Sequence, residues 1–159
     1  KYLEIASWMK EAGIDIRGAF MLGSPDETEE SLRSTIEYSK KIGIQYAIYN
    51  ITTPFPGTAL FAWAMERGFI KHTDWSLYDL ATAVMELPTV SSDVVQKYYH
   101  KAYKQFYIRT SYIFDRLFSI GSKDELKMYW KAFKGIISLL LFHKNHRQDK
   151  QSKSTNFLH

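Results

Sequence analysis

The stretch IDIRGAFMLG at residues 14–23 decides the fold class of this 159-residue chain. It alternates between polar and apolar residues at first and then becomes continuously apolar, a pattern typical of a strand buried on both faces. Residues 2–12 precede it and residues 28–42 follow it, and both segments have apolar residues at helical spacing. The order helix, strand, helix therefore surrounds the decisive stretch.

A second strand and helix follow in the same order. Residues 44–51 are rich in Tyr and Ile, which favours a strand, and Thr58 predicts the N-cap of a helix that runs to about Arg67. Strands that alternate with helices across short turns indicate parallel βα units. Because two parallel strands do not make a stable sheet alone, we expect an α/β fold in which this chain is part of a larger parallel barrel.

The pattern changes after Asp74, where it predicts helices only. At the start of the helix predicted over 28–42, Ser24 and Glu27 have capping-box spacing around Pro25, and Thr28 is a second candidate N-cap. The predicted later helices cover 75–86, 91–107, 111–120 and 122–142. We therefore expect three parts, which are barrel units at 1–72, an α-helical extension at 73–143 and a basic, disordered tail at 144–159.

Composition excludes several classes of function. The chain has no cysteine, which excludes disulfides and thiolate metal sites within it. The net charge is +4, and most of it lies in the tail, so the nearly neutral body argues against a nucleic-acid surface. The apolar run at 136–142 is far shorter than the roughly 20 residues that cross a membrane. We expect a cytoplasmic protein with no metal site in this chain.

Ligands of parallel βα folds bind where strands end, which directs attention to two loops. In the first, Gly23 allows close approach and Glu27 could bind an ammonium or hydroxyl group, or Ser24 and Glu27 could only cap a helix. In the second, Asn50, Thr52 and Thr53 could bind a ligand, or the loop could only satisfy its own backbone. The residue types offer no convincing catalytic acid, base or nucleophile.

Both loops carry a resemblance to a known family. Residues 18–28, GAFMLGSPDET, resemble the segment at strand five of radical S-adenosylmethionine (radical SAM) barrels, where Gly-x-Pro-x-Glu-Thr recurs. Residues 53–58, TPFPGT, resemble the loop after strand six, where Thr-Pro-x-Pro-Gly-Thr recurs. The segments Asp74-Trp75, Tyr78-Asp79 and the aromatic helix that ends near Tyr107 resemble the extension of members with a cobalamin-binding domain.

The resemblance implies the last two βα units of a radical SAM barrel, and a cofactor site. S-adenosylmethionine would be cleaved reductively at a 4Fe-4S cluster whose cysteines lie outside this chain, in the N-terminal half of the same polypeptide. Cobalamin would also bind outside the chain. The substrate would be a small molecule, such as a tetrapyrrole or a lipid. The implied cofactor-binding residues are Phe20 and Leu22 near the adenine, Gly23 for close approach, Glu27 to order the loop, and Asn50, Ile51 and Thr52 at the adenine edge.

Two other interpretations stay open. One is a non-enzymatic α/β module that binds a partner protein through its aromatic helices, and the other is a different barrel enzyme such as an aldolase-type lyase. The aromatic residues between 98 and 114 form packing contacts or line a hydrophobic substrate site. The basic, amphipathic segment at 127–140 docks on the parent protein or contacts a membrane surface peripherally.

Overall fold

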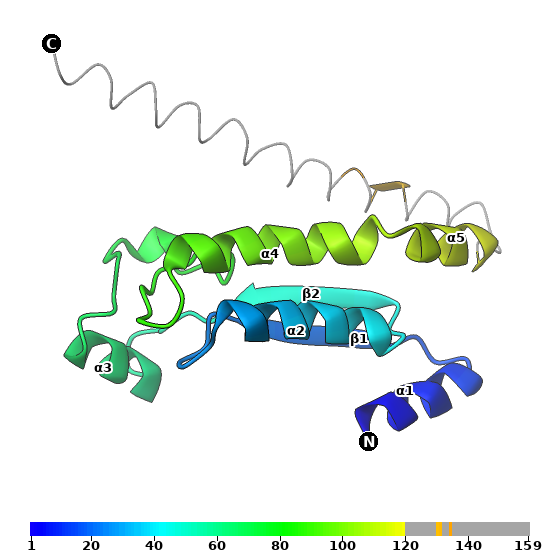
Figure 1. Cartoon of the computed structure of the whole chain (residues 1–159), viewed down its shortest axis with the longest axis horizontal. Helices are drawn as coiled ribbons and strands as arrows, with labels where there is room; N and C mark the ends of the chain where they lie inside the picture. Colours follow the sequence, from blue (N-terminus) through cyan, green and yellow to red (C-terminus); the bar gives the residue numbers. More distant parts are fainter. Residues whose placement is uncertain (120–129, 132–133, 135–159) are drawn as a thin grey trace, which may run out of the picture. The chain divides into compact units, whose positions relative to one another are not determined.

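The computed structural model describes residues 1–119, 130, 131 and 134, and shows an α/β arrangement (Figure 1). Residues 1–112 form one compact unit and residues 113–159 a second, and the account below concerns the first. The elements are α1 (Tyr2–Glu11), β1 (Arg17–Leu22), α2 (Glu29–Lys41), β2 (Tyr46–Ile51), α3 (Ala59–Glu66), the 3₁₀ turn η1 (Trp75–Leu77), α4 (Ser92–Tyr107) and α5 (Thr110–Ser119).

The two strands pair in parallel, as the sequence predicts. Their register runs from Arg17 opposite Tyr46 to Leu22 opposite Ile51, with α2 as the crossover between them. Both strands therefore end at the same edge of the sheet. The described residues contain these two strands and no closed barrel.

One face of the sheet is covered by α2 and α4 and forms the core. Tyr49 of β2 is fully buried at its centre, where its ring stacks on Phe20 at 5.4 Å and meets Phe106 of α4 edge-on at 6.4 Å. Its hydroxyl shares a hydrogen bond of 2.5 Å with Ser39 of α2. Burial raises the pKa of Tyr49 to about 12, so the hydroxyl stays protonated in this network. The core thus ties both helices to one strand.

The opposite face of the sheet is open in the described part of the chain. Met21 of β1 is 48% exposed and Ile48 of β2 is 47% exposed, and Ala19 beside them is exposed too. Burial on both faces, which the sequence predicted for residues 14–23, is therefore wrong for the described residues. The strand alternates between covered and open positions because successive side chains point to opposite faces.

Tyrosine hydroxyls from α4 and α5 occupy the backbone hydrogen-bonding groups on the outer edge of β2. The Tyr107 hydroxyl accepts from the Ala47 N–H (3.1 Å) and donates to the Ala47 carbonyl (2.8 Å). The Tyr103 hydroxyl makes the same pair of bonds to Tyr49, both at 3.2 Å. Tyr112 donates to the next carbonyl along, that of Gln45, at 3.1 Å. These bonds replace those of a neighbouring strand, so we name the three residues the tyrosine seal.

The helix predicted over 75–86 is wrong. The segment holds only the short turn η1 and an antiparallel bridge between Ile70 and Met85. Asp79 explains the change, because its carboxylate accepts from the N–H groups of Ala81 and Thr82 and so competes with a helix. Leu80 has a φ of 62°, which is also outside helical geometry. Its carbonyl accepts from the Ile51 N–H at 2.7 Å and extends the closed edge of β2.

The start of α2 decides between the two N-cap candidates. Thr28 is the N-cap. Its hydroxyl accepts from the Ser31 N–H, and the Ser31 hydroxyl accepts from the Thr28 N–H. The capping box expected at Ser24 and Glu27 is wrong, because Asp26 has a φ of 62° and no helix begins there. The other helices end close to where the sequence predicts. The predicted helix over 122–142 and the tail lie outside the described residues, apart from Trp130, Lys131 and Lys134.

Within the described residues, none of the helices has the length and apolar character needed to cross a lipid bilayer.

Candidate functional site

The two loops that follow the strands meet at the carboxyl edge of the sheet. Ser24, just after β1, and Thr52, just after β2, share a hydrogen bond of 3.0 Å between their hydroxyls. The Thr52 N–H also donates to the Leu22 carbonyl at 2.8 Å, which continues the parallel pairing to the ends of the strands. The two turns therefore lie side by side, as the parallel pairing of the strands requires. We name Ser24 and Thr52 the hydroxyl bridge.

The first loop is ordered from within by Glu27. One carboxylate oxygen accepts from the Gly23 N–H at 2.6 Å and from the Ser24 N–H at 3.0 Å. The Glu27 carbonyl in turn accepts from the Thr89 hydroxyl, at 2.6 Å, from the segment that precedes α4. A charged acceptor for two backbone donors makes strong bonds, so the loop keeps one shape. Glu27 therefore fixes the shape of the loop and does not cap a helix.

Gly23 is required for packing as well as for the turn. Its φ is 80°, and a side chain at this position would place its Cβ 2.9 Å from Cγ1 of Val95 in α4. That distance is too short for two carbon atoms, so α4 approaches β1 closely only because residue 23 is a glycine. The sequence predicted close approach of a ligand at Gly23, and in the described structure the space beside its Cα is filled by Val95.

The second loop largely satisfies its own polar groups. Thr52 and Thr53 are buried, and Thr53 donates its hydroxyl to the Ile51 carbonyl at 3.0 Å. Pro54 is also buried, whereas Phe55 next to it is 40% exposed. The loop is therefore held by short contacts before it turns outward at Phe55.

The structure separates the predicted cofactor-binding residues onto two faces. Phe20 and Leu22 lie on the covered face, and Leu22 is fully buried in the core. Asn50 lies on the open face, beside Met21 in the register. Among the described residues its side-chain amide has no hydrogen-bond partner, so both its donor and its acceptor are available to a ligand.

Sequence reasoning missed the apolar residues of the open face. Ala19, Met21 and Ile48 surround Asn50 and present an apolar surface with one free amide. The sequence does contain a signal, because residues two apart in a strand share a face, so Met21 lies on the face of Gly23 and Ile48 on that of Asn50. Residues 18–22 are all apolar or glycine, however, and such a run does not indicate which face is covered. We name Ala19, Met21, Ile48 and Asn50 the open face.

A second polar cluster lies away from the two loops and has a structural role. Lys71 donates to the Ser92 hydroxyl at 2.6 Å, and Ser92 donates to Glu86 at 2.6 Å. The hydrogen bond from Ser92 is the main reason that the pKa of Glu86 is lowered. These contacts tie the start of α4 to the segment that bridges Ile70 and Met85.

Of the cofactors that the resemblance implies, the residues of this chain fit the adenine of S-adenosylmethionine and do not fit a 4Fe-4S cluster. A 4Fe-4S cluster is held by cysteine thiolates, and the sequence contains no cysteine, so this chain cannot ligate a cluster in that way. The open face has the chemistry to hold an adenine, because a flat apolar ring can lie on Met21 and Ile48 while the Asn50 amide bonds to its polar edge.

Comparison with known proteins shows that the chain is similar in sequence to methyltransferases. It is 36% identical over 109 residues to an uncharacterized methyltransferase of Pyrococcus horikoshii, which covers 69% of this chain and 24% of that protein. It is 30% identical over 143 residues to the bacteriochlorophyllide d C-8(2)-methyltransferase of Chlorobaculum tepidum, which covers 84% of this chain and 32% of that protein. Over this region the chain is homologous to methyltransferases.

A third relative agrees, with weaker identity. The bacteriochlorophyllide d C-12(1)-methyltransferase of Chlorobaculum tepidum is 26% identical over 106 residues, which covers 67% of this chain and 23% of that protein. No protein-family model matches the chain. The chain spans about a quarter to a third of the length of these curated relatives.

Proposed function

We propose that this chain is part of a radical SAM methyltransferase, in which it forms one wall of the S-adenosylmethionine site. The single observation that carries the proposal is the hydroxyl bridge between Ser24 and Thr52. It joins the two loops whose sequences resemble the radical SAM family at the shared carboxyl edge of parallel strands. Homology to methyltransferases supports methyl transfer as the outcome of the reaction.

The open face supports the position of the cofactor. In a parallel barrel the helices lie outside and the opposite face of each strand lines the interior. Here α2 and α4 cover one face, so in such a barrel Met21, Ile48 and Asn50 would lie on the interior side. The adenine would lie on the two apolar side chains, with the Asn50 amide at its polar edge. The N–H groups of Ile51 and Thr52 already donate to the Leu80 and Leu22 carbonyls, so they would shape this end of the site and not bond to the adenine. Glu27 and Gly23 would hold the loop above it.

The two edges of the sheet support the direction in which the barrel continues. The tyrosine seal occupies the backbone groups of Ala47 and Tyr49 on the outer edge of β2. On the outer edge of β1, the backbone groups of Ala19 have no hydrogen-bond partner in the described part of the chain. A further parallel strand can therefore pair with β1 and not with β2. These strands would then be the last two of a barrel whose earlier strands belong to the N-terminal half of the polypeptide.

The remaining cofactors bind outside this chain in this proposal. The 4Fe-4S cluster needs cysteines that the chain lacks, and cobalamin would bind to a separate domain. The cluster and S-adenosylmethionine supply the radical chemistry, while the residues described here bind and orient the cofactor and exclude water.

The substrate and the setting are proposed from the relatives. Two of them are named for methylation of bacteriochlorophyllide d, so we propose a small-molecule substrate of the tetrapyrrole type. We propose a cytoplasmic enzyme, with peripheral membrane contact as an additional feature. The homology disfavours both the non-enzymatic interaction module and the aldolase-type lyase.

Equilibrium binding of S-adenosylmethionine to the full-length protein tests the proposal. Asn50→Ala removes the free amide of the open face and should weaken binding about five- to tenfold, the usual effect of losing a buried hydrogen bond. Ser34→Ala, at an exposed position on α2, is the matched control and should bind like the wild type. The proposal fails if the wild-type protein, with its cluster reconstituted, neither binds S-adenosylmethionine nor releases 5′-deoxyadenosine on reduction.

A further inference from the structure

Four aromatic residues gather just beyond the second loop. Phe55 comes from the loop after β2, Phe61 from α3, and Trp75 and Tyr78 from the turn η1 and its C-cap. The Trp75 ring lies 4.9 Å from that of Tyr78 and 6.0 Å from that of Phe61, and the Tyr78 ring lies 6.4 Å from that of Phe55. These centroid distances are those of interacting rings. We name the four residues the aromatic platform.

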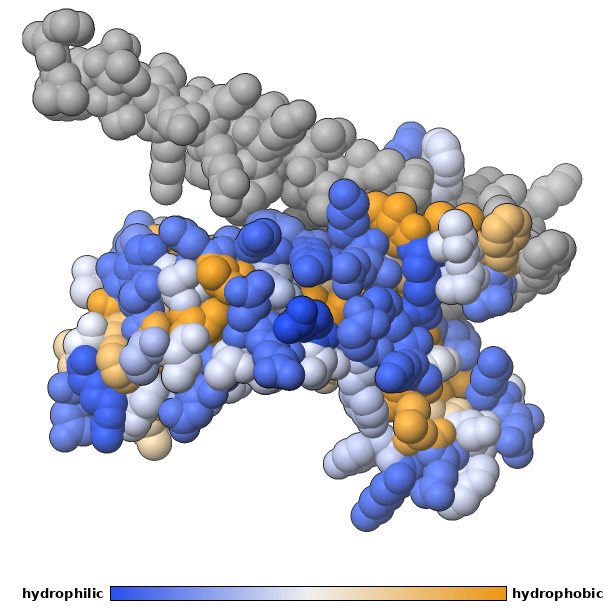
Figure 2. Space-filling model, viewed as in Figure 1, coloured by the Kyte–Doolittle hydropathy of each residue, from blue (hydrophilic) through white to orange (hydrophobic). Residues whose placement is uncertain are grey.

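The platform has a buried base and an exposed surface. Tyr78 is only 8% exposed, whereas Trp75 is 56% exposed and Phe55 is 40% exposed. Large aromatic side chains that remain exposed together mark binding surfaces more often than ordinary surface. Figure 2 shows this end of the molecule as a mixture of hydrophilic, weakly polar and apolar residues.

The exposed rings are held in place by their neighbours. The Asp74 carboxylate accepts from both the N–H (2.9 Å) and the hydroxyl (2.7 Å) of Ser76, which fixes the turn that carries Trp75. The Tyr78 hydroxyl donates to the His72 carbonyl at 2.8 Å. Phe55 lies between two prolines, which restrict its backbone. A rigid surface loses little conformational entropy when a ligand binds to it.

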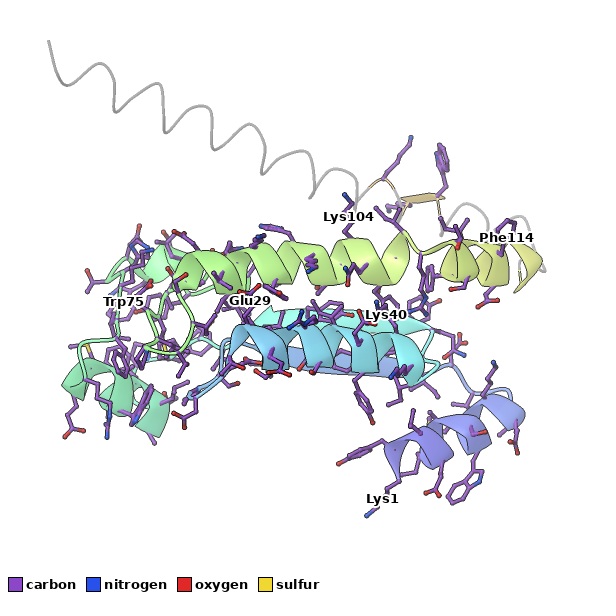
Figure 3. The ribbon with its side chains drawn as sticks, in the orientation of Figure 1. Lys1, Glu29, Lys40, Trp75, Lys104 and Phe114 are labelled. Atoms are coloured by element: carbon purple, nitrogen blue, oxygen red, sulfur yellow. The ribbon has the colours of Figure 1, made fainter. Side chains whose placement is uncertain are left out.

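The platform lies at the end of the sheet where the proposed site lies. Phe55 follows Thr52 of the hydroxyl bridge by only three residues. Figure 3 labels Trp75 at the end of the molecule where α3 lies, beyond the start of α2 at Glu29. A ligand on Trp75 and Phe55 would therefore be next to the carboxyl edge of the strands.

We propose that the aromatic platform binds a flat, conjugated ring of the substrate, by stacking on Trp75 and Phe55. This inference rests on the proposed function and names the residues that would hold the substrate in the same site. A flat conjugated ring is the occupant that fits, because aromatic side chains stack on such rings over a large area. A flexible aliphatic chain would gain contact area on the platform but no stacking.

The test titrates chlorophyllide a, a flat tetrapyrrole, into the anaerobic full-length protein and follows the change in its fluorescence. Trp75→Ala should weaken binding about tenfold, and Trp75→Phe should remain within about threefold of the wild type, since it keeps a stacking ring. Phe55→Ala should also weaken binding. Trp8→Ala is the matched control, because Trp8 is 65% exposed on α1, and it should bind like the wild type.

Three results would overturn the inference. They are unchanged binding by Trp75→Ala, no saturable binding of chlorophyllide a by the wild type, and displacement of chlorophyllide a by palmitate at equal concentration. The first result would indicate that another part of the protein covers the platform. S-adenosylmethionine binding measured on the same samples separates the two proposals, because it should be unchanged in every platform variant. If the wild-type protein does not bind S-adenosylmethionine, the proposed function itself is refuted.

Discussion

The two faces of the β1–β2 sheet contain similar residues and differ in what covers them. On the covered face, Leu22 and Tyr49 are fully buried beneath α2 and α4. On the open face, Met21 and Ile48 are each about half exposed, although both are as apolar as the residues behind them. Apolar side chains that stay exposed together on a strand mark a surface that binds a ligand or another part of a protein. The difference indicates that one face stabilises this unit and the other is available for a ligand.

Two consecutive residues offer the sharpest test of that difference. Leu22→Ala should lower the free energy of unfolding by about 2–5 kcal/mol, because it leaves a cavity in the core. Met21→Ala, one position earlier and on the open face, should lower it by less than about 1 kcal/mol. Urea denaturation of the full-length protein without ligand measures both. Equal losses at the two positions would mean that the faces are not distinct.

The glycine at the end of β1 extends the comparison to the approach of α4. Gly23→Ala should cost about 2–4 kcal/mol, since it combines a positive φ with overlap against Val95. Gly43→Ala is the matched control, because its φ is 75° and no heavy atom lies within 4 Å of the added Cβ. It should cost only about 1–2 kcal/mol.

A double variant isolates the contact with Val95. If overlap with Val95 causes the excess cost, Gly23→Ala combined with Val95→Ala should lose less stability than the sum of the two single variants. Thermal denaturation of the four proteins completes this cycle. A strictly additive result would show that the backbone conformation alone accounts for the effect.

The smallest expected effect concerns the edges rather than the faces. Tyr103→Phe and Tyr107→Phe remove hydroxyls of the tyrosine seal and should each cost about 1 kcal/mol. Hydrogen exchange should speed up about fivefold at the amides of Tyr49 and Ala47, respectively. Tyr38→Phe, at an exposed position on α2, should change neither amide. Unchanged exchange in both seal variants would mean that the hydroxyls do not protect the strand edge.

Much of the fold follows from local sequence signals. Parallel strands and the helices around them were predicted from apolar runs that end at Gly13, Gly23 and Gly43, and the structure confirms them. The failure at 75–86 also has a local cause. Apolar residues there suit a helix or an extended segment equally, and the deciding bonds come from the side chain of Asp79.

The candidate site was less predictable, for physical reasons. That the two loops meet follows from parallel pairing, so the neighbouring positions of Gly23 and Thr52 could be derived. Which face α4 covers could not be derived, because the contacts that fix it, such as Tyr107 to Ala47, join residues 60 positions apart. Motif position alone points to Phe20 and Leu22. Met21 becomes a candidate only when it is known that α4 covers the opposite face of the sheet.

Photoaffinity labelling tests most directly the central claim, which is that the open face holds the adenine of S-adenosylmethionine. Irradiation of the full-length protein with 8-azido-S-adenosylmethionine should attach the adenine to the peptide that contains Met21 or the one that contains Asn50. Excess S-adenosylmethionine should prevent this labelling. Label found only on α2, on α4 or outside this chain would contradict the account, because the open face would then not hold the cofactor.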